Sequence, residues 1–206
     1  MAVLSLRRWA TLNLLCLFMF STPGLAQDKT GPSAIVRQFQ AGLLTVMKEA
    51  GRTSVKERYD RLTPIIEETY HLTDMIRIVS GGFWNDATPA QRDRLRAAFK
   101  RMGVTTLATL FSGYSGESFE VLGERPSQQE TVIVASQIVR PEKPPIAINY
   151  VTRRVGERWY VIDVILDKAI SELRVRQSEY RAVLQRDGVE GLIKVLDGKA
   201  EQLAAQ

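Results

Sequence analysis

The period of the apolar residues changes twice along this 206-residue chain. Over residues 33–112 apolar side chains recur every three or four positions, which is the period of amphipathic helices. Over residues 118–166 the period is two, with many Val, Ile, Tyr and Phe residues, which indicates strands. The helical period returns over residues 170–203. Helices, then strands, then helices again predict an α+β domain rather than alternating β-α-β units.

Turn signals divide the middle block into four strand-like segments, so we expect a curved, antiparallel, four-stranded meander. The predicted strands are residues 118–124, 130–140, 146–155 and 158–166. About six helices should pack on this sheet. Their expected starts are Ser33, Ser54, Thr73 or Asp74, Thr88, Ile170 and Val189.

Residues 1–26 are typical of a secretory signal peptide, which leaves residues 27–206 as one domain. Arg7 and Arg8 precede an apolar stretch, and Gly24-Leu25-Ala26 offers small residues for cleavage. Removing these residues, which include no acidic side chain, lowers the net charge from +5 to +3. So mild a charge does not favour nucleic-acid binding, and the cleaved chain should not span a membrane.

Signatures of catalysis and of cofactor or metal binding are scarce. His71 is the only histidine and Cys16, inside the leader, the only cysteine, so we expect no metal and no cofactor. Gly113-Tyr114-Ser115-Gly116 resembles a nucleophile elbow, but Glu117 stands where its last glycine belongs. Asp163 and Asp167 flank the end of the last strand, either as structural carboxylates or as the centre of a small enzyme.

The strongest positive signal is an excess of apolar surface. Residues 102–111, the second half of a long predicted helix, carry no charge, so this half must be buried or line a cavity. An ordinary solid core and an internal apolar pocket both explain this pattern. The residues expected to line such a pocket are Phe83, Trp84, Val104, Leu107, Phe111, Ile146, Ile148 and Tyr150.

Several motifs resemble those of MlaC, the toluene-tolerance family of periplasmic lipid-binding proteins. They include Trp84 with Thr88-Pro89-x-Gln91-Arg92, Tyr114-Ser115-Gly116-Glu117-x-Phe119, and Gly156-x-x-Trp159-x-Val161-x-Asp163-Val164. Others are similar to HpnM, the hopanoid-associated branch: Gly42-Leu43-Leu44-x-Val46-Met47-Lys48, Arg58-Tyr59-x-x-Leu62-x-Pro64 and Ile170-Ser171-x-x-x-Val175. Two positions depart from the family pattern: His71 replaces an acidic residue, and Lys168-Ala169 replaces a glycine-containing turn.

The resemblance implies a periplasmic, non-enzymatic carrier with a fold related to the NTF2-like cone. Its cargo would be a phospholipid or a hopanoid, with the tails in the apolar pocket. Its partners would be membrane-bound transport complexes of the inner and outer membranes, of the ABC or the RND type. A small enzyme centred on Asp163 and a structural adaptor with a solid core are the alternatives.

The leader gives the first testable prediction. Because the cleavage pattern ends at Ala26, the N-terminal sequence of the exported protein should begin at Gln27. Edman sequencing or intact mass of the exported protein measures this directly. A mature chain that still begins at Met1 would make the segment an anchor instead.

Overall fold

The structure is a computed structural model that describes residues 30–166 and 170–205. The proposed leader with its cleavage site, Asp167 and Lys168-Ala169 lie outside the described residues. Helices come first: α1 (Pro32–Glu49), a 3₁₀ turn (Ala50–Arg52), α2 (Val55–Thr69), α3 (Leu72–Ser80), α4 (Gly82–Asp86) and α5 (Pro89–Leu110). The strands are β1 (Ser118–Pro126), β2 (Thr131–Arg140), β3 (Lys143–Val155), β4 (Arg158–Leu166) and β5 (Ile170–Ser171), and α6 (Glu172–Ala204) ends the chain.

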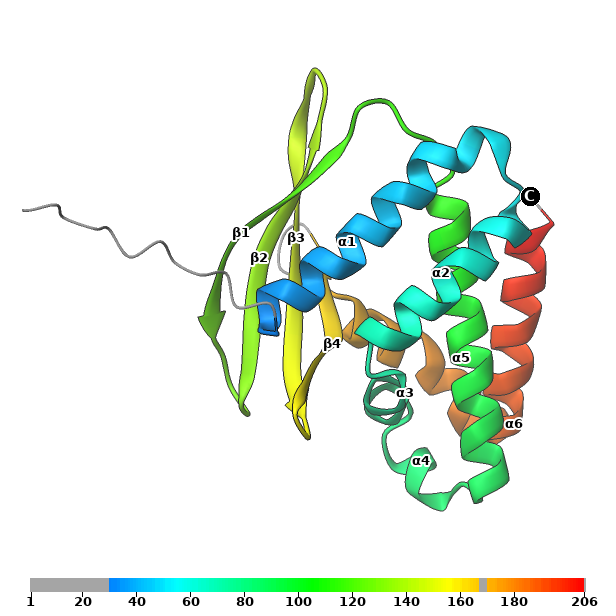
Figure 1. Ribbon diagram of the computed structural model, residues 1–206. Coiled ribbons are helices and arrows are strands. Elements are labelled where there is room, and N and C mark those ends of the chain that lie inside the picture. The colour runs from blue at the N-terminus through cyan, green and yellow to red at the C-terminus, as the bar shows by residue number, and fades with distance from the viewer. Residues whose placement is uncertain (1–29, 167–169, 206) are drawn as a thin grey trace, which may run out of the picture.

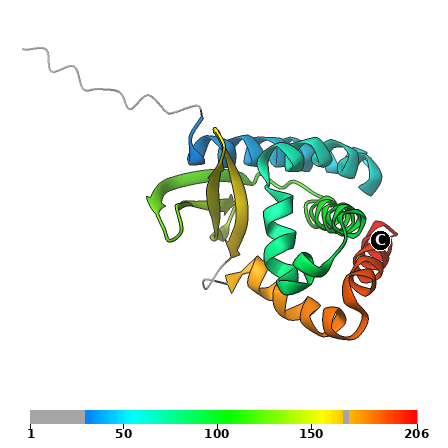
Figure 2. The same cartoon turned by 90° about the horizontal axis from the view of Figure 1, so that it is seen from below.

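The strands form one antiparallel sheet in the order β1-β2-β3-β4-β5. The helices lie to one side of this sheet (Figure 1). Seen from below, α5 is nearly end-on, with α1 on one side and α6 curving round the other (Figure 2). This arrangement is the α+β architecture that the change of period predicts.

The four-strand prediction was wrong because β5 is a fifth strand. β5 has two residues, and it pairs with the end of β4 through Ile165 opposite Ser171 and Leu166 opposite Ile170. So short a strand leaves no alternating pattern in the sequence.

The helices also differ from the prediction in two places. Gly82–Asp86 forms the short helix α4, and the last two predicted helices are joined as α6. Within α6, Gly188 has φ 64° and ψ −161°, which kinks the helix where the sequence predicts an end.

Two separate hydrophobic clusters form the interior. The upper cluster joins α1, α2, the C-terminal half of α5 and the inner face of the sheet, around Val36, Leu62, Val104, Val134 and Val161. The lower cluster joins α3, the N-terminal half of α5 and α6, around Ile76, Leu95, Leu192 and Leu196. Helix α5 therefore belongs to both clusters, and Tyr70 and Leu72, between α2 and α3, also pack against both.

The buried residue Arg58 ties the helices of the upper cluster together through backbone carbonyl groups. Its Nε donates a hydrogen bond to the Ala108 carbonyl at 2.7 Å, near the end of α5. Its Nη1 donates to the Thr53 and Ala50 carbonyls, at the turn before α2. One guanidinium thus fixes the C-terminal end of α5 against the start of α2.

This bridge gives the second prediction. Arg58→Met keeps much of the side-chain volume but removes the donors, so the free energy of unfolding should fall by about 2–3 kcal/mol. Chemical denaturation monitored by circular dichroism measures the change. Arg52→Met is the control: Arg52 is exposed, and its loss should shift the free energy of unfolding by less than about 0.5 kcal/mol. Equal effects of the two substitutions would contradict a structural role for the bridge.

Candidate functional site

A cavity of about 540 Å³ lies between the two clusters, and most of its exposed lining is apolar. Its walls come from α1, α5, the start of α6 and the inner face of the sheet. The lining draws on both clusters: Phe39, Leu43 and Met47 belong to the upper one, and Met75, Met102 and Tyr180 to the lower one. The cavity is therefore the space where two separately packed cores fail to merge.

The sheet wall follows from strand alternation. Ile146, Ile148 and Tyr150 share one face of β3, and all three line the cavity. The pairing register places Ile138 of β2 opposite Ile146, and Val164 of β4 opposite Tyr150. Neighbouring strands thus contribute to one continuous apolar surface.

Helix α5 supplies the opposite wall through residues at helical spacing. Gly103, Thr106, Leu107 and Leu110 line the cavity, at positions i, i+3, i+4 and i+7 of one face. A Cβ atom added at Gly103 would meet no other heavy atom within 4 Å. Glycine at this position therefore leaves cavity volume that almost any side chain would occupy.

Aromatic rings close the inner end of the cavity. The Phe39 ring packs edge-on against Tyr70 and Tyr150, with ring centroids 5.1 Å and 5.9 Å apart. Burial raises the pKa of Tyr150 to about 12, and burial likewise raises the pKa of Tyr70 well above its ordinary value. Both phenols are therefore neutral at physiological pH, and this end of the cavity carries no phenolate charge.

The positions of Tyr70 and Leu166 show how far the cavity lining extends along β4. It bridges to Val161 in the middle of β4, and the His71 N–H donates to the Val161 carbonyl at 2.9 Å. Leu166, which lines the cavity at the far end of β4, is five residues further on and exposed. At the rise of a strand, five residues span about 16 Å. The backbone positions of the lining residues Tyr70 and Leu166 are therefore about 16 Å apart along β4.

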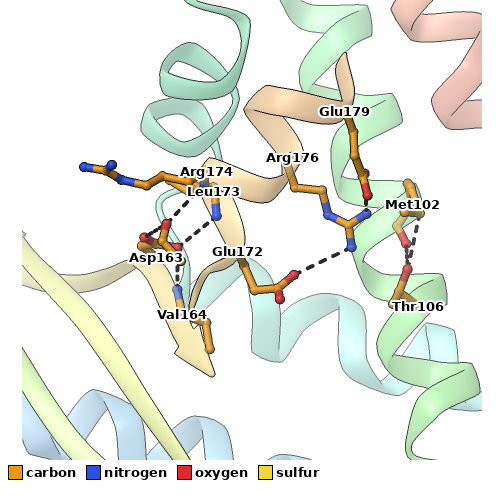
Figure 3. Close-up of polar contacts among 10 residues, drawn as sticks. Met102, Thr106, Asp163, Val164, Glu172, Leu173, Arg174, Arg176 and Glu179 are labelled. Carbon is orange, nitrogen blue, oxygen red and sulfur yellow. Dashed lines mark hydrogen bonds and ion pairs between the residues drawn. The ribbon is translucent and has the colours of Figure 1, made fainter. Parts of the chain in front are cut away.

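Charged residues of the lining lie toward its outer part. Arg176 projects from α6 toward Met102 and Thr106 of α5, with Glu172 and Glu179 on either side (Figure 3). Its guanidinium is 3.2 Å from Glu179 and 3.8 Å from Glu172.

Two other charged residues of the lining are held by backbone groups. Arg140 donates a hydrogen bond to the Pro144 carbonyl. Glu117 accepts the Ser115 N–H at 2.6 Å, and this backbone hydrogen bond lowers the pKa of its carboxyl. An apolar interior with a charged outer part suits an amphipathic ligand.

The structure brings together five of the eight residues that the sequence analysis assigned to a pocket. Leu107, Phe111, Ile146, Ile148 and Tyr150 all line the cavity. Val104 has no exposed surface, lies inside the upper cluster and does not line the cavity. Phe83 and Trp84, on α4, pack against the lower cluster and do not line this cavity.

Sequence reasoning missed the contributions of α1 and α6. On α1, Phe39, Leu43 and Met47 recur at four-residue spacing, which marks an apolar stripe but does not separate core from cavity. On α6, Leu173, Arg176 and Tyr180 are three and four residues apart, which also places them on one helical face. Only the packing of the helices decides which parts of these stripes are covered.

Asp163 has a structural setting. Its Oδ1 accepts N–H groups of Val164 at 2.8 Å and Leu173 at 3.1 Å, and its Oδ2 accepts the Ser171 hydroxyl at 2.6 Å. The Ser171 oxygen in turn caps α6 by accepting the Arg174 N–H. One carboxylate thus joins β4 to the first turn of α6.

His71 also caps a helix. Its Nδ1 accepts the Asp74 N–H at 3.3 Å at the start of α3, and its ring lies edge-on to Tyr160. Within residues 30–166 and 170–205, no three His, Cys, Asp or Glu side chains form a group that suits a metal ion. In the same residues, no helix has both the length and the apolar content needed to cross a bilayer.

Comparisons with known proteins show which fold and which family this chain shares. A phospholipid-binding protein from Ralstonia solanacearum, solved in complex with a phospholipid, superimposes with a TM-score of 0.73 at 22% sequence identity. The alignment covers 83% of this chain and 97% of that one, which shows a shared fold. A sequence model of the MlaC protein family matches residues 37–198. Because this match spans α1 to α6 and most of the chain, the protein belongs to the MlaC family.

Proposed function

We propose that this protein is a periplasmic lipid carrier that holds phospholipid tails in the cavity between its two hydrophobic clusters. The observation that carries the proposal is the cavity itself, apolar inside and charged toward its outer part. Its volume of about 540 Å³ is typical of small-molecule sites, which measure about 300–1,000 Å³. The phospholipid bound by the Ralstonia solanacearum protein of the same fold supports this cargo. A five-stranded antiparallel sheet with its helices packed on one side (Figure 1) also supports a relationship to the NTF2-like cone.

The energetics of burial make such a carrier dependent on partners. Each methylene removed from water gains about 0.8 kcal/mol, so a 16-carbon chain gains on the order of 12 kcal/mol. Spontaneous release into water would therefore be very slow. Unloading needs an acceptor with an equally apolar site, which supports shuttling between inner- and outer-membrane transport complexes of the ABC or RND type.

The outer part of the cavity would hold the head group. Arg140 and Arg176 are the two arginines of the lining, and a guanidinium is suited to bind phosphate. We propose a hopanoid as the second cargo, because several motifs are similar to those of HpnM. Leu43 and Met47 of these motifs line the cavity. Mass spectrometry of extracted lipid separates the two cargoes.

The alternatives have less support. A structural adaptor with a solid core does not need a cavity of this size. An enzyme centred on Asp163 would need a carboxylate free to exchange protons, whereas three hydrogen bonds already hold this one.

Gly103→Leu provides the third prediction and tests the proposal. The new side chain enters the cavity, so the variant should lose most of its co-purified lipid. Its stability should be unchanged or rise by up to about 1 kcal/mol, because glycine is a poor helix former. Extracted lipid phosphate or hopanoid per protein and thermal melting measure the two effects.

Two controls frame that experiment. Gly198→Leu places leucine at another helical glycine with open space around it, outside the cavity, and should keep its lipid. Val104→Trp enlarges a fully buried core residue and should destabilise the protein by about 1–3 kcal/mol. Full lipid retention by Gly103→Leu would mean that the cavity does not hold the cargo.

Asp163→Asn is the fourth prediction. Replacing the carboxylate weakens charge-assisted hydrogen bonds that join β4 to α6, so the free energy of unfolding should fall by about 1.5–3 kcal/mol. Asp93→Asn, on the exposed side of α5, is the control and should shift it by less than about 0.5 kcal/mol. A turnover activity of the pure protein that disappears only in Asp163→Asn would favour the enzyme.

A further inference from the structure

Large apolar side chains gather on the surface around the outer part of the cavity. Leu110 is 70% exposed, Ile170 50%, Tyr114 42% and Leu166 37%. Leu110 and Leu166 line the cavity, Tyr114 follows the lining residue Gly113, and Ile170 pairs with Leu166 across β4 and β5. These four residues, which we call the apolar rim, are more than half of the exposed large apolar side chains of the described residues. Such clustering marks an interaction surface rather than the scattered exposure of an ordinary monomer.

Three basic side chains lie near the apolar rim. Backbone hydrogen bonds, and then the nearby Lys143 and Arg140, lower the pKa of Glu117, a carboxylate of the cavity lining. The Lys48 ammonium lies 5.5 Å from the centroid of the Tyr114 ring. Arg140 lines the cavity and donates to the Pro144 carbonyl, and Lys143 begins the strand that follows it. None of these three cations lies within 4 Å of a carboxylate among the residues that the structure describes. The loop after α5, which carries Tyr114, and the β2–β3 hairpin, which carries Arg140 and Lys143, lie at the same end of the molecule (Figure 1).

We infer that the apolar rim is a membrane-docking surface, which inserts into the headgroup region of an anionic bilayer so that the cavity opens onto the lipid. This inference rests on the proposed function and names the surface from which cargo enters or leaves. An aromatic ring, aliphatic side chains and adjacent cations are the combination that binds at a bilayer interface. Lys48, Arg140 and Lys143 outnumber Glu117, the lining carboxylate beside them, and anionic head groups would supply the remaining negative charge. Contact of the rim with the bilayer also keeps the tails out of water during transfer, which removes the cost of exposing them.

The experiment uses the mature protein and unilamellar vesicles of phosphatidylethanolamine with a minority of phosphatidylglycerol. Co-sedimentation measures docking, and the transfer of a fluorescent phospholipid from protein to vesicles measures delivery. The test variant is Tyr114→Ser with Ile170→Ser, two rim residues that do not line the cavity. The matched control is Leu122→Ser with Val155→Ser. These are exposed apolar residues outside the rim, at the bulge of β1 and at the β3–β4 turn.

Wild type and control should bind the anionic vesicles, and binding should weaken with added salt because the cations are exposed. The test variant should bind and deliver lipid at least about tenfold more weakly, since two apolar side chains no longer enter the interface. It should keep the lipid that co-purifies with it, because its cavity is intact. Equal docking and delivery by test variant and wild type would overturn the inference.

Two other results would also overturn it. Wild-type protein that does not bind these vesicles, yet unloads to a membrane-extracted protein complex, would assign the rim to a protein partner. Equal binding to vesicles of phosphatidylcholine alone would remove the role of the three cations. Failure of the proposed function looks different, because the wild-type protein would then contain no lipid whether or not it docks on vesicles.

Discussion

The structure depends on two hydrophobic clusters that join only in part, through helix α5 and through Tyr70 and Leu72, which pack against both. Helix α5 is the shared element, with its N-terminal half in the lower cluster and Val104 and Ala108 in the upper one. A single merged core would satisfy the same apolar residues with no space left over. The separation instead leaves apolar side chains of α1, α5, α6 and the sheet facing a common volume. That volume costs stability when empty, and a bound apolar ligand would recover it.

Polar anchors hold the walls of this volume apart. Asp163 fixes the start of α6 to β4, and Arg58 fixes the end of α5 to the turn before α2. His71 begins α3 directly after Tyr70, whose ring lies at the inner end of the cavity. Each anchor is a hydrogen-bonded group at the boundary between elements. The walls can therefore stay in place without a solid core between them.

Short-range sequence patterns, such as helix caps and strand alternation, predicted much of this fold and part of the candidate site. Thr88 before Pro89 predicted the start of α5, and the structure shows its capping box with Gln91. Strand alternation placed Ile146, Ile148 and Tyr150 on one face, where they line the cavity. Other features depend on how elements pack. Val104 and Leu107 both belong to the uncharged half of α5, and only the position of α1 and the sheet decides that Leu107 lines the cavity while Val104 is in the core. The two-residue strand β5 likewise exists only because β4 lies beside it.

Native mass spectrometry of the wild-type protein, purified from the periplasm without detergent, tests the central claim most directly. If the cavity holds a lipid, the dominant species should be heavier than the mature chain by the mass of one lipid. Collisional activation should release this lipid. A protein that is fully folded and has only the mass of the bare chain would contradict it, because the space between the two clusters would then hold no cargo.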